Sequence, residues 1–251
     1  MPSAAGRKRS CAIWRRARWA CRLRLPFIRL RGVTVRPSLV IFDCDGVLVD
    51  SEGIANRALA AAVTAHGLAL DEAGSRREFV GLSMTSVMAR IEVLTGKALP
   101  PDWLPRLQAE TYDGFRAGLQ AVPGIAAAVA AVRSAGLATC VASSGTPDKM
   151  ALTLGLTGLA PLFEGRIFSA LEVRHGKPAP DLFLHAAARM GHEPGKSVVV
   201  EDSVPGVTGA VAAGMRALGF ARETDARLLA AAGAETFTDM AALPALLGLQ
   251  P

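Results

Sequence analysis

"VIFDCDGVLVDSE", residues 40–52, places an apolar run directly before two acids, Asp43 and Asp45, and a glycine, Gly46. A short apolar run without polar alternation is typical of a strand that is buried on both faces. We therefore expect a buried strand over 38–43, with Asp43 at its end and Asp45 in the loop that follows. Carboxylates two positions apart on an extended chain point the same way and repel each other, so a partner that offsets their charge is expected beside them.

Similar apolar runs recur along the chain, and helix-like segments alternate with them. Further strands are expected over 137–143, 197–202 and 216–220, and helices over 124–135, 179–190 and 206–215. Strands that alternate with helices form βαβ units, whose strands run parallel and whose crossovers are right-handed. The predicted fold class is therefore α/β, with a parallel sheet.

Residues 53–121 interrupt this alternation, because they contain helical patterns and no convincing strand. The segments "ANRALAAAVTAHG" (55–67) and "SMTSVMARIEVLTG" (83–96) each end at a glycine, which is a common stop signal for an amphipathic helix. Proline and glycine in "AVPG" (121–124) mark the return to the sheet. The expected division is a basic extension over 1–37, an α/β core over 38–52 and 122–251, and a helical insertion over 53–121.

The net charge of +6 comes from the N-terminal segment. Residues 1–37 contain eleven of the 28 basic residues and no acid, which leaves 17 basic residues against 22 acidic ones, about −5, in the remainder. The remainder therefore gives no reason to expect nucleic-acid binding. We expect 1–37 to be a disordered extension, such as an unused upstream start would add; a transit-like segment and an anchor for anionic lipid or nucleic acid are the alternatives.

The four cysteines show no paired spacing of the kind that binds metal. We therefore expect neither a zinc site nor a disulfide framework, and we predict a cytoplasmic protein, a monomer or a weak dimer. Cys44 lies between the two acids, and because neighbours on an extended chain alternate in direction, it is interpreted as a small core residue. No stretch is long and apolar enough to cross a membrane.

Polar side chains gather at the predicted carboxyl ends of the strands, where open α/β sheets bind their ligands. They are Asp43 and Asp45 after the first strand, Ser143 and Ser144 after the second, Glu201 and Asp202 after the third, and Lys177 in the loop "HGKPAPD". Several carboxylates in one small site require a cation, and Mg²⁺ prefers a few carboxylates together with a substrate phosphate. Serine hydroxyls and the lysine would then receive the phosphate oxygens.

Four motifs in this order, "FDCDGVLVDSE", "VASSG", "GKPAPD" and "VVVEDSVPGVTGAVAAGM", resemble the haloacid dehalogenase superfamily of phosphohydrolases over roughly 38–245. The resemblance implies a Rossmann-like three-layer parallel sheet with an α-helical cap domain inserted after the first strand. It also implies Mg²⁺-dependent hydrolysis of a phosphate ester through an aspartyl-phosphate.

The resemblance further assigns roles to the residues at the strand ends. Asp43 is the expected nucleophile and Asp45 the expected acid and base; Ser143, Ser144 and Lys177 would bind phosphate, and Asp43, Glu201, Asp202 and the backbone carbonyl of Asp45 would bind Mg²⁺. Each of these residues alone would suit a turn, a helix cap or a solvated surface, and only the ordered set predicts a site.

Other reactions and other functions stay open within this resemblance. A dehalogenase would lack the second acid, Asp45. A mutase resembling β-phosphoglucomutase would carry a histidine where this chain has Ala55, and an arginine where it has Met84. A non-catalytic binding protein on the same scaffold is the alternative from another class.

The cap of this family closes over the leaving group, so cap residues set the substrate. Glu52, Asn56, Gly81 and Ser83 are the candidates, and their small or polar side chains suit a hydrophilic phosphoester. The segment "FSALEV…GKPAPDLFLHAA" resembles the subgroup of 6-phosphogluconate and phosphoglycolate phosphatases. The expected partner is therefore a small phosphorylated metabolite, a sugar or sugar-acid phosphate.

Overall fold

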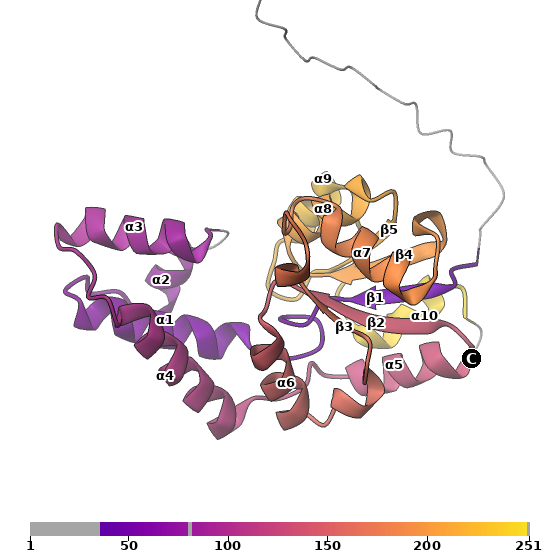
Figure 1. The fold of residues 1–251 in the computed structure, drawn as a ribbon, viewed down its shortest axis with the longest axis horizontal. Helices are drawn as coiled ribbons and strands as arrows, with labels where there is room; N and C mark the ends of the chain where they lie inside the picture. The colour runs from indigo at the N-terminus through magenta and orange to yellow at the C-terminus, as the bar shows by residue number, and fades with distance from the viewer. Residues whose placement is uncertain (1–35, 80–81, 250–251) are drawn as a thin grey trace, which may run out of the picture. The chain divides into compact units, whose positions relative to one another are not determined.

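A computed structural model describes residues 36–79 and 82–249 of the 251-residue chain. Its central element is a six-stranded sheet in the order β3-β2-β1-β4-β5-β6, in which every neighbouring pair is parallel (Figure 1). The strands are β1 (Leu39–Phe42), β2 (Ala138–Ser143), β3 (Ile167–Ser169), β4 (Ser197–Glu201), β5 (Arg216–Phe220) and β6 (Glu235–Phe237). The predicted α/β fold class with a parallel sheet is confirmed, and the structure adds that the first strand lies in the interior of the sheet, between β2 and β4.

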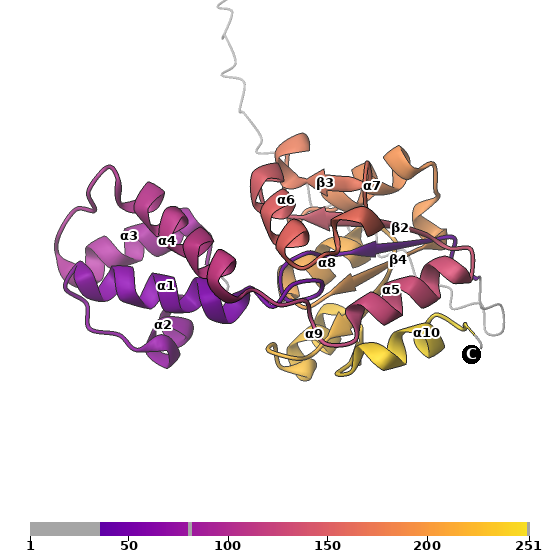
Figure 2. The ribbon, with the colours of Figure 1, turned by 90° about the horizontal axis from the view of Figure 1, so that it is seen from below.

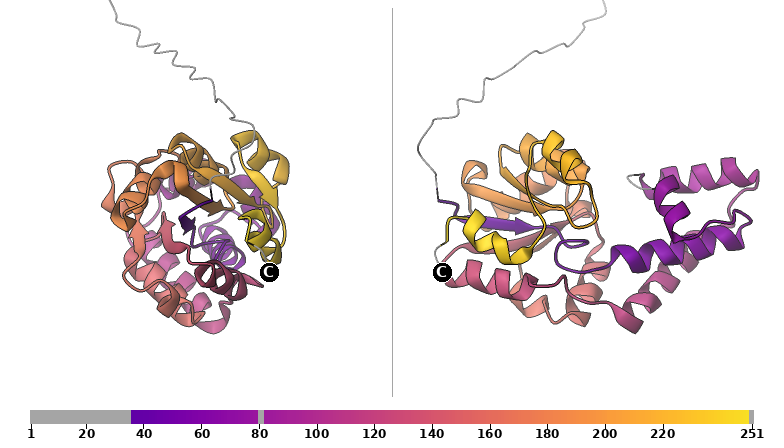
Figure 3. Two further views of the ribbon diagram at one scale, coloured as in Figure 1. Left: turned by 90° about the vertical axis from the view of Figure 1, so that its right-hand side faces the viewer. Right: turned by 180° about the vertical axis from the view of Figure 1, so that it is seen from behind.

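Helices cover both faces of the sheet, and the alternation of side chains along β1 shows why. Val40 and Phe42 join one apolar cluster, which includes Val129 of helix α5, whereas Leu39 and Ile41 join another on the opposite face. One layer contains α5 (Ile125–Ser134), α6 (Pro147–Leu156) and α10 (Leu243–Leu246); the other contains α7 (Asp181–Met190), α8 (Val204–Ala212) and α9 (Ala226–Ala232). Figures 1 and 3 show the sheet between these layers, and Figure 2 looks onto the sheet from the side of α5 and α10.

The predicted helical insertion is present between β1 and α5. It consists of α1 (Glu52–Ala65), α2 (Glu72–Phe79), α3 (Met84–Thr95) and α4 (Trp103–Gly118). The four helices share their own small apolar cluster, built around Val63, Ile91 and Trp103. A cluster of its own is the physical basis of a separate cap, because these side chains are buried without help from the sheet.

The two chain segments that connect the cap with the sheet run side by side. Val49 and Ala121 form an isolated antiparallel bridge, and the backbone N–H of Asp50 donates to the carbonyl oxygen of Gln120 at 2.9 Å. We propose these two segments as the hinge of the cap.

Some elements of the structure were not predicted from the sequence, and one predicted helix has different bounds. Strands β3 and β6 have three residues each, and helices α6, α9 and α10 lie in segments where no element was expected. The helix expected over 206–215 lies at Val204–Ala212 instead. It ends early because Gly214, at φ +73°, adopts a left-handed conformation before β5.

Two further predictions concern Cys44, which the structure describes, and the N-terminal segment, most of which it does not. Cys44 is buried in an apolar cluster of the core, as expected, and burial raises the pKa of its thiol above the ordinary value. The basic segment predicted over 1–37 falls almost wholly outside the described residues. Within the described part of the chain, no helix combines the length and the apolar character that a bilayer crossing needs.

Candidate active site

Three acids meet at the carboxyl edge of the sheet. Asp43 directly follows β1, Glu201 is the last residue of β4, and Asp202 comes next. One carboxylate oxygen from each lies within 4.8 Å of the others. Because β1 and β4 are parallel neighbours in register, the two strands deliver their terminal acids to the same point.

Lys177 is held among these acids by the loop before α7. Its Nζ lies 2.5 Å from Asp43 Oδ1 and 2.5 Å from Glu201 Oε1, and only 6% of its side chain is exposed. Burial alone would lower the pKa of this lysine, but the attraction of Asp43 and Glu201 outweighs burial and raises the pKa above its usual range. The two carboxylates therefore favour the charged ammonium form of Lys177.

One lysine does not offset the charge of three acids, of which Asp43 and Glu201 are buried and Asp202 is half-buried. Burial raises the pKa of Asp43 to about 7; Lys177 opposes this shift, and the neighbouring charges of Glu201 and Asp45 reinforce it. Burial, followed by the charges of Glu201 and Asp43, also raises the pKa of Asp202 well above its ordinary value. A group of oxygen donors that still lacks positive charge fits a small divalent cation such as Mg²⁺.

Glycine occupies the position beside this cluster where a side chain would not fit. Gly46 has a φ of +73°, in the left-handed region, and a Cβ atom on it would collide with the Asp202 carboxylate. Helix α8 makes a similar approach on the other side, where a Cβ atom on Gly206 would collide with Glu201. The small residues leave space for the acids to converge.

Asp45 lies in the loop after β1 and has its own partners. The Ser51 hydroxyl donates to Asp45 Oδ1 at 2.6 Å, and Lys149 Nζ donates to Oδ2 at 2.8 Å. Lys149 was not identified from the sequence. Burial lowers the pKa of this lysine, but the charge and hydrogen bond of Asp45 more than offset burial, so that the pKa lies above its ordinary value.

The serines expected to bind phosphate lie at the end of β2. Ser143 is buried, and its hydroxyl oxygen accepts a hydrogen bond from the backbone N–H of Gly145 at 3.1 Å. Ser144 is exposed at the start of the loop. Ser169, at the end of β3, braces this loop by donating to the carbonyl oxygen of Gly145 at 2.7 Å. The structure thus brings Ser143 to the same sheet edge as the acids.

The cap residues predicted to contact the substrate do not all lie near the acids. Glu52 begins α1 directly after Ser51, whose hydroxyl donates to Asp45, so Glu52 lies on the segment that contacts the second acid. The Asn56 amide instead donates to the backbone of Glu72 within the cap, and Ser83 caps helix α3 by accepting from the backbone N–H of Ser86. Gly81 lies outside the described residues.

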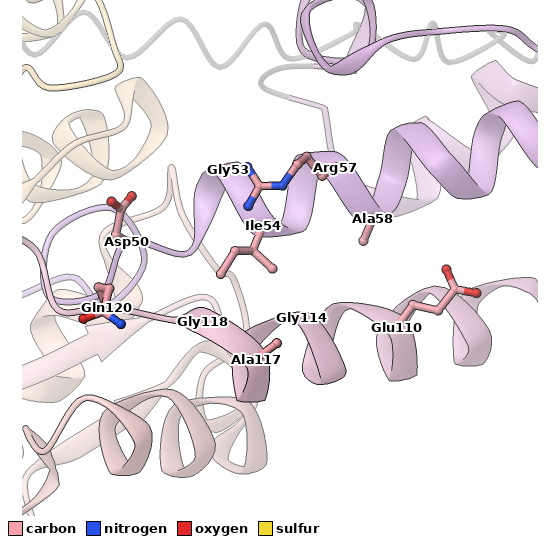
Figure 4. A pocket seen from close by; sticks show the side chains of 10 residues that line it. All are labelled: Asp50, Gly53, Ile54, Arg57, Ala58, Glu110, Gly114, Ala117, Gly118 and Gln120. Atoms are coloured by element: carbon pink, nitrogen blue, oxygen red, sulfur yellow. The ribbon is translucent and has the colours of Figure 1, made fainter.

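A separate pocket of about 620 Å³ opens between α1 and α4 (Figure 4). It is lined by Asp50, Gly53, Ile54, Arg57, Ala58, Glu110, Gly114, Ala117, Gly118 and Gln120. None of the residues that line it belongs to the acid cluster. We place the chemistry at the acid cluster, because that is where the buried charged groups converge.

Comparison with known proteins identifies the family of this chain. Residues 37–214 match the family model described as haloacid dehalogenase-like hydrolase. The 6-phosphogluconate phosphatase of Escherichia coli (strain K12) is 30% identical over 212 residues, which are 84% of this chain and 95% of that protein.

Solved structures with a similar fold belong to the same group of proteins. A HAD family hydrolase from Deinococcus radiodurans R1, with bound phosphate and sodium, has a TM-score of 0.74 at 32% identity, over 86% of this chain and 99% of that one. A putative β-phosphoglucomutase from Thermotoga maritima has a TM-score of 0.72 at 26% identity, over 84% of this chain and 98% of that one.

The family match and the similarity to curated phosphatases show that the protein is a phosphoric monoester hydrolase. Its parallel sheet has acids and a buried lysine at the carboxyl edge, and a helical cap follows the first strand. The chain belongs to the haloacid dehalogenase-like hydrolase family. The family resemblance of the four sequence motifs is thereby confirmed.

Proposed function

We propose that this enzyme is a Mg²⁺-dependent phosphatase that hydrolyses a small sugar phosphate or sugar-acid phosphate through an aspartyl-phosphate intermediate. The observation that carries the proposal is the convergence of Asp43, Glu201 and Asp202 around the buried Lys177, close to Asp45. The similarity to a 6-phosphogluconate phosphatase supports the substrate class.

Asp43 and Asp45 would share the covalent chemistry. The Asp43 carboxylate attacks phosphorus, the bond to the ester oxygen breaks, and the phosphoryl group is carried on Asp43. Asp45 gives a proton to the departing oxygen. Asp45 then takes a proton from the water that attacks the same phosphorus, so that inorganic phosphate leaves and both carboxyl groups return to their starting state.

Lys177 and the serines would hold the phosphoryl group during both steps. Lys177 already lies against the Asp43 carboxylate, so it is positioned to neutralise oxygens of a phosphoryl group attached there. The Ser143 hydroxyl, fixed by the backbone of Gly145, and the exposed Ser144 would donate to the remaining oxygens.

Asp43, Glu201, Asp202 and the backbone carbonyl of Asp45 would hold the metal ion. When bound, Mg²⁺ supplies positive charge that offsets the acids and the phosphoryl oxygens. Glu52, Gly81 and Ser83 stay proposed contacts of the substrate's leaving group. Glu52 is the best supported, because it directly follows Ser51, whose hydroxyl donates to Asp45.

The proposal is tested by screening phosphorylated metabolites against the purified protein, with Mg²⁺ and with EDTA. We expect phosphate release from sugar or sugar-acid phosphates that requires Mg²⁺. Metabolites that bind without any turnover, across aryl and alkyl phosphates and with Mg²⁺ present, would instead favour a non-catalytic binding protein.

A sugar-phosphate mutase is the second candidate, because the putative β-phosphoglucomutase from Thermotoga maritima shares the fold. Ala55 in α1 and Met84 at the start of α3 occupy the positions where the mutase pattern has a histidine and an arginine. We therefore favour hydrolysis. Phosphorus NMR of a reaction with an aldose 1-phosphate separates the two, since a mutase moves the phosphate within the sugar and a phosphatase releases it.

A further inference from the structure

We infer that Lys149 is a positioning residue that holds Asp45, the proposed acid and base, in its working orientation. The inference deepens the proposed function and rests on it. Lys149 Nζ lies 2.8 Å from Asp45 Oδ2, and Ser51 Oγ lies 2.6 Å from Oδ1. Both oxygens of this carboxylate are thus held, by donors from two different elements of the fold.

The place of Lys149 in its helix points to a role beyond helix stability. Thr146 caps α6 by accepting from the backbone N–H of Lys149, so the lysine sits in the first turn. Positive charge there opposes the helix dipole, and a lysine is more often extended into water. Here the side chain is only 26% exposed and lies near the Phe115 ring, with Nζ 5.9 Å from the ring centre.

Ser51, like Lys149, makes a contact with Asp45 in place of one that would stabilise its own helix. It occupies the N-cap position of α1, where serine is a preferred residue because its oxygen accepts from the first turn. The Ser51 side chain makes no such capping bond. Its hydroxyl donates to Asp45 instead, so this buried residue contributes to the orientation of the acid rather than to the helix end.

The two lysines of the site, Lys177 with a buried side chain and the half-buried Lys149, then have separate tasks. Lys177 contacts Asp43 and Glu201, on the side where the phosphoryl group is transferred. Lys149 contacts Asp45, which must meet the departing oxygen in one step and a water molecule in the next. A carboxylate that rotated freely would often point away from the departing oxygen and from the water molecule. Holding its two oxygens in place preserves the reactive geometry.

The test compares an alkyl ester with an aryl ester. Departure of an alkyl oxygen needs the proton from Asp45, whereas p-nitrophenolate leaves without one, and kcat/KM reports the steps through transfer to Asp43. For Lys149→Met we expect kcat/KM for 6-phosphogluconate to fall about 10- to 100-fold, and that for p-nitrophenyl phosphate to change less than about threefold. Lys149→Arg should recover much of the loss, because it keeps a cationic donor.

Lys196→Met is the matched control. Lys196 is exposed, pairs with Glu193, and precedes β4 at the edge of the sheet opposite the site, so both esters should react as with the wild type. Ser51→Ala provides a second variant in case Lys149→Met does not fold by circular dichroism, and it should show the same preference for the aryl ester.

Three results would overturn the inference. Equal losses with both esters would mean that Lys149 serves the phosphoryl site or the fold. Unchanged kinetics in both Lys149→Met and Ser51→Ala would mean that Asp45 needs no clamp. A wild-type enzyme that hydrolysed neither ester with Mg²⁺ would remove the proposed function, and the role of Lys149 with it.

Discussion

As the proposed nucleophile, Asp43 would have to be both buried and reactive, two properties that oppose each other in a carboxylate. Burial favours the protonated form, which cannot attack phosphorus, and only positive charge reverses this preference. Lys177 provides part of that charge, and the pKa of Asp43 is still about 7. The remaining charge must come from a ligand of the acid cluster.

Asp43→Asn separates the chemistry of this residue from its role in the fold. Loss of the nucleophile should lower turnover of p-nitrophenyl phosphate at least ~10³-fold. The melting temperature without Mg²⁺ should stay equal or rise, because a buried charge that Lys177 only partly offsets has been removed. Asp113→Asn is the control, since Asp113 is exposed and pairs with Arg116 on α4. Retained hydrolysis would remove Asp43 as the nucleophile.

Gly46→Ala tests the close approach beside the cluster. The left-handed backbone should cost about 1–2 kcal/mol with any Cβ atom, and the added methyl group must also displace Asp202. We expect lower stability together with a higher Mg²⁺ concentration for half-maximal activity. Gly96→Ala is the matched control: its φ is +64°, and a Cβ atom there meets nothing within 4 Å. A metal requirement that rose equally in both variants would contradict this account.

At the scale of elements, the strands with long apolar runs could be predicted and the short ones could not. β1, β2, β4 and β5 carry enough apolar residues to show burial on both faces, and they position Asp43, Ser143 and Glu201. β3 and β6, with three residues each, become strands only by pairing with a neighbour. Their short sequences contain too little pattern to indicate a strand.

Lys149 illustrates the same limit within the site. The acids and Lys177 occur in motifs that are recognisable along the chain. The partner of Asp45 lies 104 residues away, on a helix that was itself not predicted. Only the topology, which sets α6 beside the loop after β1, brings the two together. A lysine in the first turn of a capped helix is the one sequence signal that could have drawn attention to it.

The N-cap of α6 offers a prediction at this scale. Thr146→Ala removes the cap and should destabilise the protein by about 1 kcal/mol. Because Lys149 lies in that first turn, the variant should also lower turnover of an alkyl phosphate. Asp225→Ala removes the corresponding cap of α9 and should affect stability alone. Thermal melts measure the loss of stability in each variant, and kcat/KM measures the loss of turnover. Equal activity of Thr146→Ala and Asp225→Ala would mean that the N-terminal end of α6 does not support the site.

At the scale of the whole molecule, the acid cluster should couple metal binding to stability. A ligand that binds only the folded state stabilises it by about 2.7 kcal/mol at a hundred times its Kd. We therefore expect Mg²⁺ to raise the melting temperature of the wild type and to raise that of Asp202→Asn much less. Melting curves recorded over a Mg²⁺ titration, with EDTA as the reference, measure the effect. Identical curves for the wild type with Mg²⁺ and with EDTA would argue against a metal site at this cluster.

The position of β1 in the sheet has a consequence for how the protein is made. Leu39 pairs with Ala138 and Ser197, so the strand that precedes the proposed nucleophile can pair only with residues 99 and 158 positions further along the chain. During synthesis the cap helices can pack first, while this strand has no neighbour. The acid cluster is therefore assembled late in synthesis. A nascent chain that ended before β4 would contain the folded cap helices but not the acid cluster.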